Sequence, residues 1–405
     1  MKTTTPIHDS ASHHWLIFDP IPFSGGSKVA TREILNLCPD KQIKLTILCA
    51  DKNDWNEPRL IKRHQIQFAS CQLLGALQSA SNGWRYWLKQ LCYTLMILWQ
   101  MVKQPGIDTV IGASGPGVDM ALYLVRLVFR YRLIQFIHGP VGASRSIGYC
   151  LSRADKVFYL ANCRDSMLRA LERYYRSRVS VSAATELARF NIGSPHFFTF
   201  QNGIGEQRWP TPCIYGEPTI FWAASLLKWK GLETLVEAGS ILNQQIPVNV
   251  HVCYIRPKNT RLEVSEAPLD LDNFYWYQQP DNLDEIRSRC SIYISTSTKE
   301  PFGLSVLEGM AAGMCVFIPR DGAYWDQTLT HNLNCIKYTP GSASSLASEL
   351  LQIIIKPERI VRIGLSAMKA ARQYRAEKCY RQIIHTLTES GTLPSVVVQQ
   401  AERAG

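Results

Sequence analysis

Short apolar runs alternate with helical stretches along almost the whole chain, and this alternation constrains the fold more than any other feature. Alternating strands and helices are typical of parallel sheets covered by helices on both faces. The strands predicted in the first half are Trp15–Asp19, Lys44–Cys49, Asp108–Ile111, Leu133–His138 and Lys156–Leu160. Those predicted in the second half are Thr219–Ser225, Val248–Tyr254, Asn273–Tyr277, Ser291–Ser295 and Cys315–Pro319. We therefore predict an α/β protein with two doubly wound, Rossmann-like domains that face each other across a cleft.

The boundary between the two series lies in a segment without apolar periodicity. Residues Gly205–Pro218 contain three prolines and two glycines, and we interpret them as a linker. A chain of 405 residues is long enough for two or three domains. We predict an N-terminal domain over residues 1–205 and a C-terminal domain over 206–372. The last segment, 373–405, is expected to form a helix that crosses back to the N-terminal domain, followed by a tail.

Charge and cysteine content narrow the partners and the compartment. The formal net charge is +11, which favours anionic partners such as nucleotide phosphates or an acidic membrane surface. The basic residues are scattered, so we expect no nucleic-acid partner. The twelve cysteines are spread singly and suggest a reducing compartment without a zinc or redox motif. Residues Met1–His14 are polar and lack a signal core, so we predict a cytoplasmic protein.

The most informative stretch is Ser295–Asp321, which reads as strand, loop, helix and strand. Its loop contains Glu300, and Gly303 opens the helix that contains Glu308. The free N–H groups of a helix N-terminus bind phosphate. Glu308 lies five residues beyond Gly303, which is ~7.5 Å along a helix and about the reach from a pyrophosphate to ribose hydroxyls. Taken alone, two glutamates at this spacing are more often ordinary surface and helix residues.

The residues around the two glutamates favour a ligand-binding role over that ordinary one. Glu300, Pro301-Phe302-Gly303-Leu304, Glu308 and Ala311-x-Gly313 closely resemble the signature of the family-four retaining glycosyltransferases, bacterial polysaccharide-type enzymes of group 1 with the GT-B fold. The resemblance implies that Glu300 lies near the donor sugar as a catalytic residue and that Glu308 holds the ribose. It also implies that the backbone at Phe302, Gly303 and Leu304 contacts the donor phosphates.

A second match lies in the sequence ASLLKWKG, residues 224–231, between a predicted strand and helix. A lysine in such a loop can pair with phosphate as a point charge, although a lone lysine is usually only solvated. In the family this loop supplies an arginine and a lysine that bind the diphosphate, and Lys230-Gly231 matches its end. Ser225 stands at the arginine position, and we expect Lys228 to replace the lost charge. Lys230 is therefore predicted to stabilise the leaving diphosphate without a metal ion or other cofactor.

The first half contributes two weaker candidates. Gly25 and Gly26 follow the first predicted strand and permit a positive φ or a close approach to a ligand, although a simple tight turn is an equal alternative. His138 ends the strand Leu133–His138, where a lone histidine is more often structural. The family resemblance implies that the two glycines face donor and acceptor and that His138 acts near the donor sugar.

Two apolar segments could either pack in the core or lie on a membrane surface. Trp84–Met101 and Leu122–Arg132 are apolar with aromatic and basic flanks. They read either as core helices or as interfacial helices that bring the protein to an anionic membrane surface. No window of about 18 uninterrupted apolar residues predicts a spanning helix. The Asp270-x-Asp272 triplet is common by chance, and we expect no metal site there.

Together these features predict a retaining glycosyltransferase that uses a nucleotide-sugar donor. The resemblance implies a glycan or lipid-linked saccharide as acceptor, in polysaccharide or cell-envelope biosynthesis. Three alternatives stay open: a sugar-nucleotide epimerase of the same fold, a phosphorylase with lysine-bound pyridoxal phosphate, and a catalytically impaired subunit that binds a nucleotide or glycan. A nucleotide-binding dehydrogenase is disfavoured, because no G-x-G-x-x-G motif follows the first strand.

Overall fold

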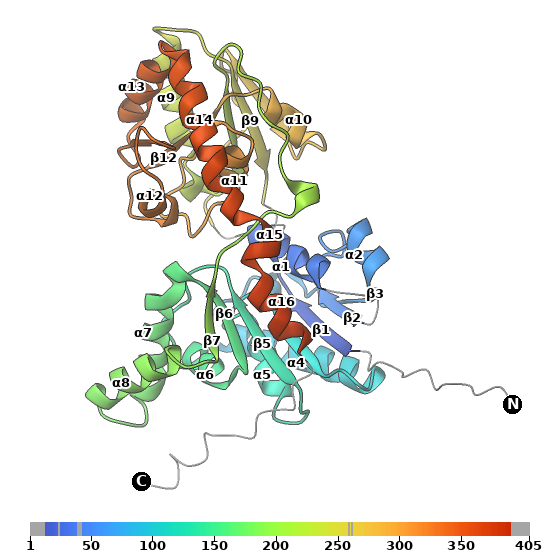
Figure 1. The fold of residues 1–405 in the computed structure, drawn as a ribbon. Coiled ribbons are helices and arrows are strands. Elements are labelled where there is room, and N and C mark those ends of the chain that lie inside the picture. The colour runs from blue at the N-terminus through green and yellow to red at the C-terminus, as the bar shows by residue number, and fades with distance from the viewer. Residues whose placement is uncertain (1–12, 23–24, 39–42, 258–259, 261, 390–405) are drawn as a thin grey trace, which may run out of the picture.

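The computed structural model describes residues 13–22, 25–38, 43–257, 260 and 262–389. The chain forms two α/β domains, each built on one parallel sheet (Figure 1). The strand orders are β3-β2-β1-β4-β5-β6-β7 and β10-β9-β8-β11-β12-β13. Each order reverses beside its first strand, as in doubly wound sheets. The predicted fold class is therefore confirmed.

The N-terminal sheet is buried on both faces, as parallel sheets are. Trp15, Leu16, Ile17 and Phe18 of its central strand are fully buried. The strands are β1 (His13–Asp19), β2 (Ile43–Cys49), β3 (Gln65–Ser70), β4 (Thr109–Gly112), β5 (Arg132–Ile137), β6 (Lys156–Leu160) and β7 (Phe197–Phe200). All described pairings in this sheet are parallel.

Helices cover the two faces of this sheet in two groups. One group is α1 (Gly26–Leu37) and α2 (Pro58–Arg63), which contact each other. The other runs through successive contacts from α3 (Gly75–Gln78) and α4 (Gly83–Lys103) to α5 (Met120–Val125), α6 (Arg145–Arg153), α7 (Arg164–Tyr175) and α8 (Val181–Ile192). The apolar segment Leu122–Arg132 does not form one continuous helix, since α5 ends at Val125. Residues 126–130 form a turn instead, because the chain must reach the start of β5 at Arg132.

The C-terminal domain has its own sheet and core. Its strands are β8 (Ile220–Ser225), β9 (Val250–Ile255), β10 (Phe274–Gln278), β11 (Ile292–Ile294), β12 (Cys315–Pro319) and β13 (Ile336–Tyr338). Its helices are α9 (Leu232–Asn243), α10 (Leu283–Ser288), α11 (Leu304–Ala311), α12 (Tyr324–Thr328), α13 (Ala343–Ile354) and α14 (Pro357–Ala371). The cluster of Ile220, Trp222, Val252, Ile294 and Phe317 lies at the centre of this core.

The chain passes between the domains twice, and the two passages lie side by side. After α14, the short helices α15 (Ala376–Cys379) and α16 (Arg381–Thr388) contact α1 of the N-terminal domain (Figure 1). The N–H of Ile204 donates to the carbonyl of Tyr374 at 3.0 Å, and the N–H of Ala376 donates to the carbonyl of Ile204 at 3.1 Å. These bonds fix the linker to the returning chain. The boundaries drawn after residues 205 and 372 stay a prediction.

Candidate functional site

Two loops of the C-terminal domain are joined at the carboxyl end of its sheet. Thr296, after β11, accepts a hydrogen bond from Trp222 Nε1 at 2.9 Å and donates to the carbonyl of Lys230 at 2.7 Å. Gly231 has φ +72°, and a Cβ there would lie 2.4 Å from the Thr296 carbonyl. Glycine alone fits this conformation and this close approach. The loop after β8 and the loop after β11 therefore form one rigid unit.

Lys230 and Glu300 come together across these two loops. The Lys230 ammonium forms an ion pair and a hydrogen bond with Glu300 Oε2. Both side chains are partly buried, with exposed fractions of 17% and 18%. Glu300 also lines a small, partly open hollow beside Ser297 and Asp321. The predicted pair is thus assembled at an opening where a ligand can reach it.

Gly303 opens α11 beside this pair. Its φ is +73°, and a Cβ there would lie 3.0 Å from Glu300 Cγ and 3.3 Å from a methyl group of Val306. Phe302 is buried against the rings of Tyr324, Trp325 and Tyr374, so its side chain anchors the loop while its backbone stays at the helix entrance. In the first turn of α11, the N–H of Val306 donates to the carbonyl of Gly303 at 3.1 Å. Among the described residues no backbone partner takes the N–H groups of Leu304 and Ser305, which are left for an anion.

The two domains meet at the same place. A Cβ on Gly26 of α1 would lie 3.4 Å from Leu304 Cδ1 of α11. Asn162, which follows β6, donates from Nδ2 to the carbonyl of Pro301 at 3.0 Å. Residues predicted from the two halves of the sequence therefore converge on the entrance of α11.

Glu308 is held by arginines that the sequence interpretation missed. Arg287 of α10 donates from Nη1 to Glu308 Oε2 at 2.9 Å, and Arg208 Nη2 lies 3.9 Å from Oε1. Arg287 is almost fully buried, with 6% of its side chain exposed. A carboxylate has about four lone-pair sites, so Glu308 keeps acceptor capacity for a ligand. No sequence signal marks Arg287, because it stands on an ordinary helix.

Ser225 and Lys228 lie apart from this cluster. Ser225 ends β8 and pairs in register with Ile255 of β9. Lys228 Nζ lies 3.9 Å from Glu263 Oε2, and 58% of the Lys228 side chain is exposed. Within the described ranges, no hydrogen bond or ion pair connects either residue to Glu300. Their predicted part in donor binding stays a prediction.

In the N-terminal domain, His138 is a shielded histidine. It follows β5 and packs against the rings of Phe136 and Phe200. Neither ring nitrogen has a hydrogen-bond partner among the residues that the structure describes, although both are shielded from water. This burial lowers the pKa of His138 to about 4. The imidazole is therefore neutral near pH 7, with one donor and one acceptor left for a ligand.

Gly25 and Gly26 take ordinary conformations. Gly25 has φ −160°, which is extended backbone, and it caps α1 with its carbonyl accepting from Val29 N at 3.2 Å. Gly26 is the first helical residue. Neither glycine uses the positive φ that glycine permits, so that expectation is wrong for both. Gly26 lies close to Leu304 of the C-terminal domain, and the expected approach of the two glycines to a ligand stays a prediction.

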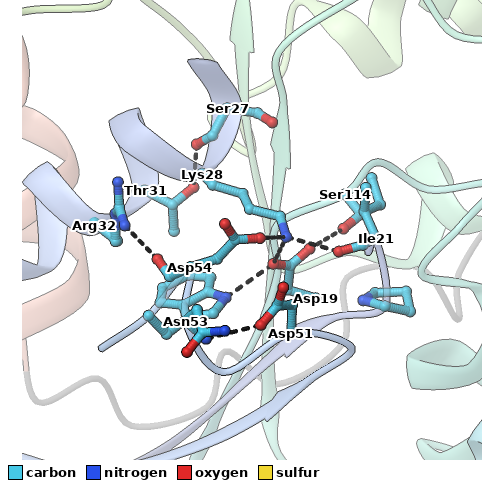
Figure 2. Close-up of polar contacts among 12 residues, drawn as sticks. Asp19, Ile21, Ser27, Lys28, Thr31, Arg32, Asp51, Asn53, Asp54 and Ser114 are labelled. Atoms are coloured by element: carbon cyan, nitrogen blue, oxygen red, sulfur yellow. Dashed lines mark hydrogen bonds and ion pairs between the residues drawn. The ribbon is translucent and has the colours of Figure 1, made fainter. Parts of the chain in front are cut away.

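A buried charge cluster supports the first turn of α1. Figure 2 shows the Lys28 ammonium between the carboxylates of Asp19 and Asp54, at 3.1 and 2.5 Å. It also donates to the carbonyl of Ile21 at 2.7 Å. Ser114 Oγ donates to Asp19 Oδ1 at 3.1 Å and connects the cluster to the loop after β4. Sequence interpretation did not find these residues, because they lie in separate, unremarkable segments.

Comparisons with known proteins agree with this geometry. Residues 204–370 match the family described as glycosyl transferases group 1. Among solved structures, Anabaena Alr3699/HepE in complex with UDP-glucose superposes with a TM-score of 0.66 at 16% identity, over 93% of this chain and 99% of that one. Sucrose-phosphate synthase from Thermosynechococcus elongatus gives 0.63 at 15% identity, over 93% and 97%. The lipopolysaccharide outer core galactosyltransferase WaaB gives 0.59 at 13% identity, over 93% and 99%. No curated protein matches the sequence.

The likenesses extend over both domains, and at these identities they show a shared fold, that of the GT-B glycosyltransferases. The family match covers the C-terminal domain, including Lys230, Glu300 and Glu308. The resemblance to group 1 glycosyltransferases of GT-B fold, drawn from the motif around Glu300, is thereby confirmed, while retention stays a prediction.

Proposed function

Because residues 204–370 belong to the glycosyl transferases group 1 family, we propose that this glycosyltransferase acts with retention on a nucleoside-diphosphate sugar. The observation that carries the proposal is the Lys230–Glu300 contact at the entrance of α11. It places a cation, a carboxylate and free helix N–H groups around one opening. The cation and the helix N–H groups can bind a diphosphate, and the carboxylate can accept hydrogen bonds from sugar hydroxyls. Since the Anabaena structure contains UDP-glucose, a uridine donor is the first to test.

In the proposed reaction, the bond between the anomeric carbon and the diphosphate oxygen breaks first. Lys230 and the N-terminus of α11 stabilise the negative charge on the leaving diphosphate. Glu300 accepts hydrogen bonds from donor-sugar hydroxyls and holds the oxocarbenium-like sugar in place. The acceptor hydroxyl then forms the new bond from the same face, and its proton passes to the leaving phosphate oxygen. The anomeric configuration is retained.

The N-terminal domain completes the donor site in this proposal. His138 is neutral, so it can donate to or accept from a sugar hydroxyl without adding charge. Gly26 lies against Leu304 and leaves room for the donor beside the helix entrance. Phosphate binding falls to Gly303 and Leu304 through their N–H groups, with Gly25 on the opposite side.

The acceptor in this proposal is a glycan or a lipid-linked saccharide of the cell envelope, and the site of action is the cytoplasm. WaaB, a lipopolysaccharide outer core galactosyltransferase, has the same fold. We expect no metal requirement, because Lys230 and the helix dipole supply the positive charge that a divalent ion supplies elsewhere. Glycosyl transfer that is unchanged in excess EDTA would agree with this, and transfer that depends on added Mg²⁺ or Mn²⁺ would contradict it.

A non-catalytic partner subunit is the second candidate, favoured by Ser225 at the position where the family has an arginine. The test is a thermal-shift screen with UDP, GDP, ADP and their sugar conjugates, on wild type, Glu308→Gln and Glu263→Gln. Glu263 is an exposed acid beside Lys228, so its variant is the matched control. A ligand at 100 times its Kd stabilises the fold by about 2.7 kcal/mol.

We expect one nucleotide to raise the melting temperature of wild type and the control, and to raise that of Glu308→Gln less. Release of free nucleoside diphosphate from the matching sugar conjugate would then separate the enzyme from the partner subunit. A folded wild type that responds to no nucleotide would contradict the donor site itself.

A further inference from the structure

The long helix α4 exposes a continuous apolar stripe. Its members follow one another at intervals of three or four residues, so they lie along one side of the helix. Between 41% and 71% of each residue is exposed. We call this set the α4 stripe: Trp84, Leu88, Leu91, Leu95, Trp99 and Val102.

The opposite side of α4 packs against the protein core. Its buried residues are Gln90, Tyr93, Ile97 and Met101, and the ring of Tyr93 contacts that of Phe18 at a centroid distance of 5.3 Å. A surface helix of a water-soluble protein normally turns its apolar side inward and its polar side outward. In α4 the outward side is at least as apolar as the inward side. The core therefore does not account for the α4 stripe.

The neighbouring segment repeats the pattern. Helix α5 packs against α4, and the turn that follows α5 exposes 74% of Leu127 and 73% of Val128. Exposed arginines flank both segments, with Arg85 on α4 and Arg130 after the turn. Both helices lie on the side of the N-terminal sheet opposite α1 and α16 (Figure 1). The apolar area is thus larger than one helix and has basic residues around it.

The charge of these segments is entirely positive. Residues 58–107 contain six lysines and arginines and no acidic residue, and residues 120–154 contain five arginines and again no acidic residue. Some of these cations are engaged within the fold, since Lys89 donates to the carbonyl of Gln78 and Arg126 pairs with Asp155. A surface that combines exposed tryptophan and leucine with an excess of positive charge is complementary to anionic lipid.

We propose that the α4 stripe lies in the interface of an anionic lipid bilayer and holds the protein on the membrane surface. Tryptophans near both ends of the stripe suit the headgroup level, where an indole ring has apolar and polar neighbours. A second copy of the chain is a poorer occupant, because a symmetric pair would bring two acid-free, basic surfaces together. Among the described helices none is long and apolar enough to span a membrane, so α4 lies on the bilayer. The inference does not depend on the proposed glycosyl transfer.

The test is sedimentation with vesicles of phosphatidylcholine, with and without 30 mol% phosphatidylglycerol. The variant Leu91→Gln/Leu95→Gln/Trp99→Gln removes the middle of the α4 stripe and keeps residues that suit a helix. The control Val181→Ser/Phe190→Ser removes apolar side chains of similar exposure, 62% and 79%, from α8. We expect the first variant to bind anionic vesicles at least about 100-fold more weakly than wild type, from the apolar area it no longer buries. The control should bind as wild type does.

Two further measurements keep the outcome decisive. Binding of wild type should weaken as salt rises from 0.05 to 0.5 M, because salt screens its attraction to phosphatidylglycerol. Acyl-brominated lipids should quench the tryptophan fluorescence of wild type, which requires no variant to fold. Failure of wild type to bind anionic vesicles, or equal binding by the α4 variant, would overturn the proposal. A wild-type dimer in light scattering that the α4 variant abolishes, without vesicle binding, would assign the stripe to a second copy instead.

Discussion

Each domain places a lysine just after the first strand of its sheet, and the two lysines have opposite surroundings. Lys28 lies in the first turn of α1 after β1, and Lys230 precedes α9 after β8. Lys28 is 5% exposed and directs its ammonium to Asp19, Asp54 and the carbonyl of Ile21. Lys230 is 17% exposed and contacts one carboxylate, Glu300, and the ring of Trp229 at 4.0 Å.

The difference separates a structural cation from one that can bind a ligand. An ammonium has three N–H donors. At Lys28 three acceptors lie within hydrogen-bond distance, and water is excluded. At Lys230 the described residues offer one carboxylate beside an opening, which leaves donors for a diphosphate. The same residue type at equivalent places in two similar folds therefore has a role set by its neighbours rather than by its position.

The largest effect that this comparison predicts is on stability. We expect Lys28→Met to destabilise the fold by about 3–5 kcal/mol, because it leaves Asp19 and Asp54 as buried carboxylates without their cation. The same change at Lys230 should cost less than about 1 kcal/mol, since that pair is partly solvated. Urea unfolding of both variants measures the difference. Equal losses of unfolding free energy in the two variants would contradict the distinction between a structural Lys28 and a ligand-binding Lys230.

The converse prediction concerns activity. Lys230→Met should lower kcat by about 10²–10³-fold, the usual cost of removing one group that stabilises developing negative charge. Lys369→Met is the control, because Lys369 is an exposed lysine on α14 with no part in the proposed site. The control should keep kcat within about threefold, since it removes only a solvated surface charge. If Lys228→Met lowers kcat as much as Lys230→Met does, Lys228 also binds the diphosphate. Steady-state kinetics with the donor found by thermal shift decides between them.

The sequence predicted which residues of the C-terminal candidate site lie together, for a local reason. Glu300, Gly303 and Glu308 lie within nine residues, so one loop and one helix turn fix their relation. Lys230 was predicted from a second short stretch, and the parallel sheet brings both loops to the same edge because β8 and β11 are neighbours. The partners of these residues were not predictable. Arg287 reaches Glu308 from another helix, and no sequence pattern encodes that contact.

The N-terminal half shows where sequence reasoning ends. Alternation of strands and helices implied a parallel, doubly wound sheet, but the cluster of Asp19, Lys28 and Asp54 joins residues up to 35 positions apart that have no motif. The segment Trp84–Met101 was left between a core helix and an interfacial one. A stripe repeating at helical spacing fits either until burial shows which side faces inward. Both features depend on long-range packing, which the sequence pattern does not encode.

A smaller effect is expected from His138 on acid stability. Burial lowers the pKa of His138 to about 4, while a histidine in the unfolded chain has a pKa near 6.5. The unfolded chain therefore binds more protons between these values, and this contribution is complete above pH 6.5 and is lost as pH falls toward 4. We expect His138→Phe to remove up to about 3 kcal/mol of that pH dependence. Urea unfolding at pH 5 and 7.5 measures it, with His385→Gln, an exposed histidine, as control. If His138→Phe and wild type show the same change in unfolding free energy between pH 5 and 7.5, the His138 ring is solvated in the folded protein.

The last effect has the opposite sign and arises beside the Lys28 cluster. Asp119 is buried, accepts from Ser114 N at 3.0 Å and from Gln135 Nε2 at 2.7 Å, and its burial raises its pKa to about 8. The folded chain therefore holds a proton that the unfolded chain releases near pH 4, so stability is lost as pH rises from about 4 to 8. Asp119→Asn keeps an acceptor and removes the titration. We expect it to unfold up to about 5 kcal/mol less easily than wild type at pH 8.5, with the gap narrowing toward pH 5. If the difference in unfolding free energy between Asp119→Asn and wild type stays constant with pH, Asp119 is ionised in the folded protein. Ser114 would then connect the Lys28 cluster to a second charged carboxylate rather than to a neutral acid.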